Sequence, residues 1–274
     1  MPIKKSELYS SLWASCDELR GGMDASQYKD YVLALLFIKY ISDRYANSED
    51  CRPPIKIPKD ASFQDMALLK GQSDIGDRIN TKIIGPLVEA NKARLSKHDF
   101  PNFNDTNKLG EGNAIVERLT NLIAIFEKPE LDFSKNRAEH DDILGDAYEY
   151  LMRHFAQDSG KSKGQFYTPS EVSRIIARLI GIGNIKFDPN KSWTLYDPAA
   201  GSGSLLIRAA DEAPVGPYGD LVTIHGQEKD ISTAGLANMN LVLHHKDTGR
   251  VERGNTLVDP SAAAHLRIAS AWRL

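Results

Sequence analysis

Hydrophobic residues follow two different patterns along the chain, and the pattern changes after the middle. In the first half they recur every three or four residues, which is the spacing of amphipathic helices. The segment SQYKDYVLALLFIKYISDRY predicts one such helix, and the paired prolines in CRPPIKIPKD end it. Its apolar face comprises Tyr28, Val32, Leu35, Leu36, Ile38 and Ile41. Further helices are predicted over 77–95, 114–126 and 141–155.

After about residue 190 short apolar runs alternate with helical patterns. WTLYDP, LVTIHGQE and GRVERGNTL predict strands, and GSLLIRAADEA and ISTAGLANMNLVLHH predict the helices between them. Strands joined by crossover helices form a parallel sheet of the doubly wound kind, which binds ligands at the carboxyl ends of its strands. We therefore expect an α-helical N-terminal domain over 1–136 and an α/β doubly wound, Rossmann-like domain over 137–274.

The segment GQFYTPSEVSRIIARLIG predicts a helix over 169–180 that joins the two patterns. Thr168 suits the N-cap, Pro169 the first helical position and Glu171 the third, as in a capping box. We expect the helix to bury an apolar face and to stop at Gly181. That face comprises Val172, Ile175, Ile176, Leu179 and Ile180. The helix start does not explain the amide and two aromatics at 165–167, so a second role for them in lining a pocket stays open.

Composition and charge limit the class of protein. A chain of 274 residues is long enough for two domains, and the formal net charge of −3 excludes a uniformly basic nucleic-acid clamp without excluding a local basic patch. Cys16 and Cys51 lie far apart, which argues against a disulfide framework or a zinc site and favours a reducing compartment. The sequence has no signal-peptide core and no apolar stretch that could span a membrane. We therefore expect a cytoplasmic protein with no metal site.

The candidate chemistry lies at the predicted strand ends. DPAAGSGS, residues 197–204, follows the first strand, and its glycines allow a tight turn and close approach of a ligand. A helix that begins near Ser204 directs free N–H groups towards that space. Glu228 ends the next strand, where a carboxylate can accept hydrogen bonds from a ribose diol.

Spacing alone does not identify the nucleoside ligand. Leu206 occupies the position where a dinucleotide fingerprint requires its third glycine. Asp197 would repel a pyrophosphate but would attract a ligand that carries ammonium and sulfonium groups. Both features favour S-adenosylmethionine over NAD.

These motifs, in this order, resemble those of a known family. GQFYTP, DPAAGSGSLLIRA, GQEKD with NMNLVLHH, and GNTL are similar to the motifs of modification subunits of type I restriction-modification systems. The helical half, with ILGDAYEYLMRHFA, resembles the N-terminal domain of that family. The resemblance extends to about Asp259. It implies a methyltransferase domain that uses S-adenosylmethionine to methylate adenine N6 in DNA.

The resemblance also implies roles for individual residues. Glu228 would bind the ribose of the cofactor and Asn255 would lie near its adenine ring. The methionine part would be held by Asp197, Ala199, Gly201, Ser202, Gly203 and Ser204. The segment that borders the cofactor would be Gln165, Phe166, Tyr167, Thr168, Pro169 and Ser170. The implied partners are DNA, a specificity subunit and a restriction subunit, with no membrane.

One family motif is missing from the sequence. Members of the family hold the target adenine with an Asn-Pro-Pro-aromatic segment after a fourth strand, whereas the only Pro-Pro here is Pro53-Pro54. No catalytic residue is therefore assigned, and we expect a methyltransferase domain that is incomplete at its C-terminus, truncated near Pro260 and inactive alone. One alternative is a non-catalytic interaction module that binds the other subunits. Another is a nicotinamide dehydrogenase, which Leu206 and Asp197 disfavour.

Overall fold

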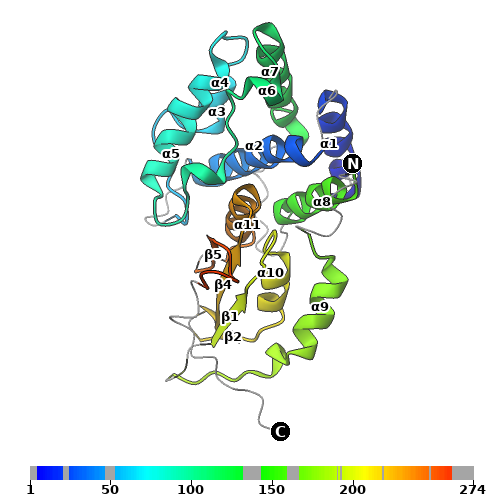
Figure 1. Ribbon diagram of the computed structural model, residues 1–274, viewed down its shortest axis with the longest axis vertical. Coiled ribbons are helices and arrows are strands. Elements are labelled where there is room, and N and C mark those ends of the chain that lie inside the picture. The colour runs from blue at the N-terminus through cyan, green and yellow to red at the C-terminus, as the bar shows by residue number, and fades with distance from the viewer. Residues whose placement is uncertain are drawn as a thin grey trace. The chain divides into compact units, whose positions relative to one another are not determined.

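The computed structural model describes residues 5–20, 25–46, 53–131, 143–158, 167–189, 191, 193–217, 219–246 and 248–260. The stretch after Pro260, where the sequence lacks a predicted fourth strand, lies outside these residues. The chain forms two compact units, one of residues 1–165 and 242–244 and one of residues 166–241 and 245–274 (Figure 1). The first unit is helical and the second is α/β, which confirms the predicted fold class.

The helical unit consists of helices joined by polar loops. The predicted helices over 26–45, 114–126 and 141–155 are confirmed as α2, α7 and α8. The elements of this unit are α1 (Lys5–Arg20), α2 (Ala25–Tyr45), α3 (Phe63–Ala67), α4 (Ile75–Arg78), η1 (Ile79–Ile84), α5 (Gly85–Ala90), η2 (Lys97–Asp99), α6 (Thr106–Leu109), α7 (Asn113–Phe126), η3 (Pro129–Leu131) and α8 (Ile143–Asp158). Because α8 groups with these helices, the compact unit extends beyond residue 136, the predicted end of the helical domain.

Helix α2 forms the core of the helical unit. It is buried on all sides rather than only on the predicted apolar face, because α1, α3, α7 and α8 all contact it. Two of its lysines are buried as well, and each is paired: Lys29 Nζ lies 2.9 Å from Asp30 and Lys39 Nζ lies 2.7 Å from Asp43. Pairing offsets the cost of burying these charges.

The helix predicted over 77–95 is interrupted and ends at Ala90. The π-helical segment η1 separates α4 from α5, and Gly85 N–H bonds to Asn80 O, five residues earlier. Pro86 follows at the start of α5. A proline has no N–H and clashes with the carbonyl four residues before it, so a wider turn at this point accommodates Pro86.

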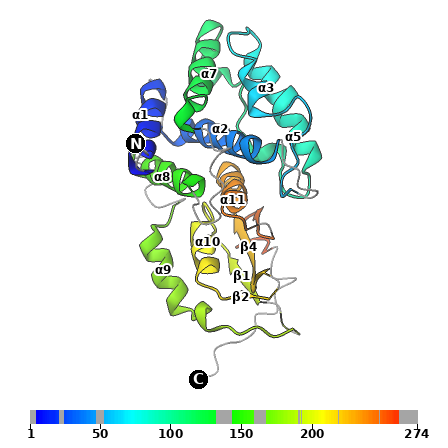
Figure 2. The same cartoon turned by 180° about the vertical axis from the view of Figure 1, so that it is seen from behind.

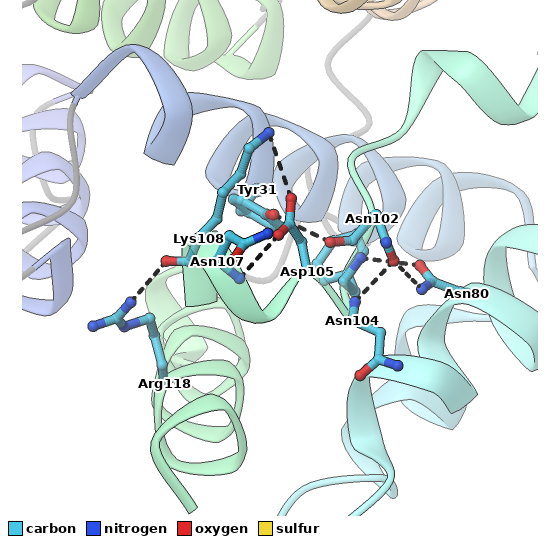
Figure 3. A network of polar contacts seen from close by, with 9 residues as sticks. Tyr31, Asn80, Asn102, Asn104, Asp105, Asn107, Lys108 and Arg118 are labelled. Atoms are coloured by element: carbon cyan, nitrogen blue, oxygen red, sulfur yellow. Dashed lines mark hydrogen bonds and ion pairs between the residues drawn. The ribbon is translucent and has the colours of Figure 1, made fainter. Parts of the chain in front are cut away.

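Asparagine side chains order the polar loop over 101–110 (Figure 3). Asn80 Nδ2 donates to Asn102 Oδ1 over 2.7 Å, and Phe103 N–H donates to Asn80 Oδ1 over 3.1 Å. Tyr31 of α2 donates its hydroxyl to Asn102 O over 3.1 Å. These bonds attach the loop to α2 and η1, and the buried ring of Phe103, which packs edge-on against Tyr31, adds apolar contact to them.

The α/β unit contains a three-stranded parallel sheet in the order β1-β4-β5. The three strands and two helices predicted after residue 190 are confirmed as β1, β4, β5, α10 and α11. The short hairpin β2–β3 was not predicted. The elements are α9 (Ser170–Leu179), η4 (Ile182–Asn184), β1 (Trp193–Asp197), α10 (Ser204–Asp211), β2 (Val215–Gly216), β3 (Gly219–Asp220), β4 (Val222–Glu228), α11 (Ile231–Leu243) and β5 (Arg250–Arg253).

One face of the sheet carries the core of this unit. Leu195 and Ile224 of the strands join a buried cluster with Leu206 of α10 and Ala237 of α11. Side chains alternate along a strand, so the intervening residues point to the opposite face, where Thr194 and His225 are exposed. Helix α10 lies between α9 and the strands in both views (Figures 1 and 2).

Helix α9 exists as predicted, but its start and its buried face differ from the prediction. Pro169 is the N-cap, with an extended ψ of 140° and no capping side-chain bond, so the helix begins at Ser170 and the predicted Thr168 cap is wrong. Gly181 has φ +73° and follows the helix end, which confirms it as the stop.

The buried residues of α9 are Ser173 and Ala177, while Ile175 is 58% and Leu179 80% exposed. The small residues let α9 pack closely on α10, which leaves the apolar stripe outside.

Unfolding experiments can test this orientation of α9. Replacement of Ile175 by Ser should change the free energy of unfolding by no more than about 0.5 kcal/mol, because the side chain is already hydrated. Leu206→Ala, at a site that is 3% exposed, should cost about 2–5 kcal/mol. Urea titration of both variants measures the difference, and equal losses would contradict the exposed orientation.

Candidate functional site

The strands bring two carboxylates to one edge of the sheet. Asp197 is the last residue of β1 and Glu228 is the last residue of β4. The parallel register pairs Asp197 with Gly226, so Glu228 extends two residues further. Gly254 and Asn255 follow the end of β5 at the same edge. The predicted convergence of these three strand ends is confirmed.

The glycine turn after β1 lies directly on β4. Ala200 N–H donates to Gln227 O over 3.0 Å, and Gly203 N–H donates to Ala200 O over 2.8 Å. Gly201 and Gly203 have φ values of +54° and +76°, which residues other than glycine rarely adopt. Gly203 is the N-cap residue of α10, so the turn determines where the first-turn N–H groups of that helix begin.

A glycine inside β4 makes this close approach possible. A Cβ placed on Gly226 would lie 2.8 Å from Ala200 Cβ and 3.0 Å from Leu206 Cδ1. The first distance is shorter than Cβ contacts in proteins, and the second is tight enough that Leu206 would have to shift. Gly226 was not assigned a role from the sequence, although a glycine inside a strand often indicates such a close approach.

Backbone N–H groups hold the carboxylate of Glu228 from two sides. Oε2 accepts from Gly201 N–H over 3.0 Å, and Oε1 accepts from Asp230 N–H over 2.9 Å. A carboxylate has about four lone-pair acceptor positions, so each oxygen retains capacity for one further donor. Glu228 is therefore oriented by the protein and still able to accept two hydroxyl groups.

Asp197 is half-buried beside Glu228. Its Oδ1 accepts from Ala199 N–H over 2.9 Å. Burial raises the pKa of the Asp197 carboxyl above its usual value and the charge of Glu228 raises it further, against the opposing effect of the Ala199 N–H. A cation placed beside Asp197 would lower the pKa of this carboxyl and so favour its ionised form.

The two serines of the turn face inward. Ser202 and Ser204 are 1% and 5% exposed, and their hydroxyl oxygens lie 2.9 Å apart in a mutual hydrogen bond. Their side chains therefore stabilise the turn, and the groups that they can offer a ligand are backbone N–H groups.

The loop after β5 is attached to the end of β1. Thr256 Oγ1 donates to Pro198 O over 2.6 Å, and the buried Gln227 Nε2 donates to Asp259 O over 2.8 Å. Asn255 Oδ1 accepts from Leu257 N–H over 3.2 Å, so its side chain shapes its own loop. Gln227 and Thr256 lie within GQEKD and GNTL, but the sequence assigned no role to either residue.

The predicted segment over 165–170 is described only in part. Gln165 and Phe166 lie outside the described residues, while Tyr167 is 9% exposed, Thr168 and Ser170 are half-buried and Pro169 is exposed. Thr168 and Ser170 make no side-chain hydrogen bond to the strand ends in the described part of the chain. The role of the segment at a cofactor stays a prediction.

Within the described ranges, no cluster of three or more His, Cys, Asp or Glu side chains could hold a metal ion. None of the helices described there is both long and apolar enough to cross a membrane.

A parallel sheet with a glycine turn after one strand and an oriented carboxylate at the end of the next is the arrangement found in doubly wound α/β domains that bind nucleosides. Two family models match the chain in order: the HsdM N-terminal domain over residues 8–126 and N-6 DNA Methylase over residues 139–269. The chain belongs to the family of type I restriction-modification methylase subunits.

Individual relatives agree with the family models. The type I restriction enzyme MpnII methylase subunit of Mycoplasma pneumoniae is 32% identical over 89% of this chain and 51% of its own length. The MjaVIII methylase subunit of Methanocaldococcus jannaschii is 30% identical over 94% of this chain and 44% of its own length. The chain thus spans about half the length of these curated relatives.

A solved structure supports the same assignment. The methyltransferase subunit of the type I restriction-modification system from Streptococcus thermophilus superposes with a TM-score of 0.71 at 27% identity. The match covers 94% of this chain and 60% of that one.

The importance of the left-handed glycine in the turn can be tested against a matched glycine elsewhere. Gly203 (φ +76°, ψ 0°) and Gly181 (φ +73°, ψ 23°) have nearly the same backbone conformation. Replacement of either by Ala should cost about 1–2 kcal/mol of stability from the left-handed strain. Only Gly203→Ala should weaken nucleoside binding, as measured by calorimetry on both variants. If both variants bind the nucleoside with the same affinity, the conformation of Gly203 is not required for binding.

Proposed function

We propose that this chain carries the S-adenosylmethionine site of a type I modification methylase, and that the whole protein transfers a methyl group to adenine N6 in DNA. The observation that carries the proposal is the carboxylate of Glu228, held by Gly201 N–H at the end of β4 and next to Asp197. The membership of the chain in a methylase family supports the same reaction.

The groups at the strand ends fit the chemistry of this cofactor. The two remaining acceptor positions of Glu228 suit the ribose diol, and the half-buried Asp197 suits the ammonium group. The first-turn N–H groups of α10, which begins at Ser204, suit the carboxylate of the methionine part. Asn255, in the loop after β5, is assigned to the adenine ring, and the backbone of Ala199, Gly201, Ser202 and Gly203 to the methionine part.

The remaining assignments concern the other side of the cofactor and its chemistry. The segment over 165–170 would cover the cofactor next to α9. S-adenosylmethionine supplies an electrophilic methyl group on its sulfonium when bound. The carboxylates of Asp197 and Glu228 would hold the cofactor through its polar ends, and the target adenine would have to leave the duplex to reach it.

The helical unit is proposed to contact DNA and the specificity and restriction subunits of a type I complex in the cytoplasm. The match of residues 8–126 to the HsdM N-terminal domain supports a function shared with the other family members. A second candidate is a non-catalytic interaction module, in which the α/β unit binds no cofactor. Cofactor binding distinguishes the two proposals.

Calorimetric titration with S-adenosylmethionine tests the cofactor site directly. We expect saturable binding, no binding of NAD, and at least about a tenfold loss of affinity in Glu228→Ala, because a charged hydrogen-bond acceptor is removed. Glu228→Gln is the matched variant, since it keeps the shape but removes the charge and places an NH2 donor opposite either Gly201 N–H or Asp230 N–H. A folded chain that binds no S-adenosylmethionine would leave only the interaction module.

The pH dependence of binding should report on Asp197. Cofactor affinity should rise as pH increases through the raised pKa of Asp197, because only the ionised carboxylate attracts the ammonium group. The stability of the free protein should fall over the same range, because the folded state binds the proton more tightly than the unfolded state. Asp197→Asn should remove both trends and weaken binding about tenfold or more. Calorimetry and urea unfolding across the acid range measure them, and an unchanged pH profile in the variant would contradict the assignment.

A further inference from the structure

The side chain of Asn240 reaches the glycine turn from α11. Asn240 is 2% exposed, and its Nδ2 donates to the backbone oxygen of Ser202 over 3.0 Å. Asn240 lies in NMNLVLHH, one of the stretches that carry the family resemblance, but the resemblance assigned no role at the site to it. We propose that Asn240 is a positioning residue that sets the conformation of the glycine turn for cofactor binding, an inference that rests on the proposed function.

The bond acts on one peptide unit of the turn. The carbonyl of Ser202 and the N–H of Gly203 belong to the same planar peptide. Asn240 Nδ2 holds the carbonyl end, and Ala200 O accepts from the N–H end over 2.8 Å. With both ends held, the peptide cannot flip, and Gly203 stays in the left-handed conformation from which α10 starts.

Helix α11 is placed to make this contact. A Cβ added to Gly203 would lie 3.6 Å from Ala237 Cβ, so α11 passes next to the turn at Ala237. Asn240 follows three residues later on the same helical face. Asn238 points elsewhere: it donates to Val251 O over 3.0 Å and accepts from Val251 N–H over 2.9 Å, which attaches α11 to β5.

Stability alone does not account for the carboxamide at position 240. Asn240 Oδ1 is buried without a hydrogen-bond partner among the described residues. An unsatisfied buried acceptor is costly, and an apolar side chain at this position would exchange it for an unsatisfied Ser202 carbonyl. The exchange is close to neutral for stability, but only the asparagine holds the turn.

Three variants separate positioning from general stability. Asn240→Leu removes the Nδ2 donor and keeps a side chain of similar size. Asn240→Asp replaces Nδ2 by an oxygen and keeps the shape of the side chain. Burial raises the pKa of a carboxyl at this site, so at low pH the Asp side chain is protonated and can donate to Ser202 O again. Asn238→Leu is the matched control on the same helix, since it removes two hydrogen bonds to β5 and none to the turn.

Binding of S-adenosylmethionine, melting temperature and amide hydrogen exchange of peptides over 197–207 are the measurements. Asn240→Leu should weaken binding about tenfold and speed exchange in the turn to a similar degree, with little change in melting temperature. Asn240→Asp should show the same deficit at neutral pH and recover relative to the wild-type chain as pH falls. Asn238→Leu should lower the melting temperature and leave exchange in the turn unchanged.

The outcomes separate this inference from the proposed function. Exchange and affinity in Asn240→Leu that match the wild-type chain would overturn the positioning role, as would faster exchange of the turn in Asn238→Leu to the same degree. If the wild-type chain binds no cofactor, the proposed function fails. Hydrogen exchange in the turn then still decides whether Asn240 sets its conformation.

Discussion

The hydrogen bond from Gly201 N–H to the carboxylate of Glu228 is the interaction on which the site depends. It joins the loop after one parallel strand to the end of the next, and it forms only because the turn lies directly on β4. Gly226 allows that approach, since a Cβ there would lie only 2.8 Å from Ala200 Cβ. The position of α10, and with it the direction of its first-turn N–H groups, follows from the same turn.

Backbone groups, more than reactive side chains, build this site. The serine hydroxyls of the turn bond to each other, Gln227 and Thr256 hold the neighbouring loop, and Asn240 holds a peptide carbonyl. The two acidic side chains supply its charge, and because they lie close together in a partly buried place, the pKa of Asp197 is raised. Such an arrangement suits the binding of a ligand that carries both a cation and hydroxyl groups.

The helical unit is organised by different means. Its core is a helix buried on all sides, and its polar loop over 101–110 is ordered by asparagine and tyrosine hydrogen bonds (Figure 3). Its buried thiol, Cys16, has a pKa raised to about 12 by burial, so it is not a reactive nucleophile. These properties describe a unit held together by packing and hydrogen bonds, with Cys16 as part of its core.

The sequence by itself determined the main helices of the first half, the alternation of strands and helices in the second half, and the parallel sheet that follows from it. Hydrophobic periodicity and the glycine turn are local signals, so the strand ends at Asp197 and Glu228 could be identified without a structure, while Asn255 was assigned from the family resemblance of GNTL.

Only the tertiary structure decided which side of α9 is buried, because Ser173 and Ala177 permit close packing on α10 that apolar periodicity does not reveal. It also decided the contacts of Gly226, Gln227 and Asn240 with the turn. Each of these contacts joins residues more than 20 positions apart, and such pairings depend on how the strands and helices pack rather than on local pattern.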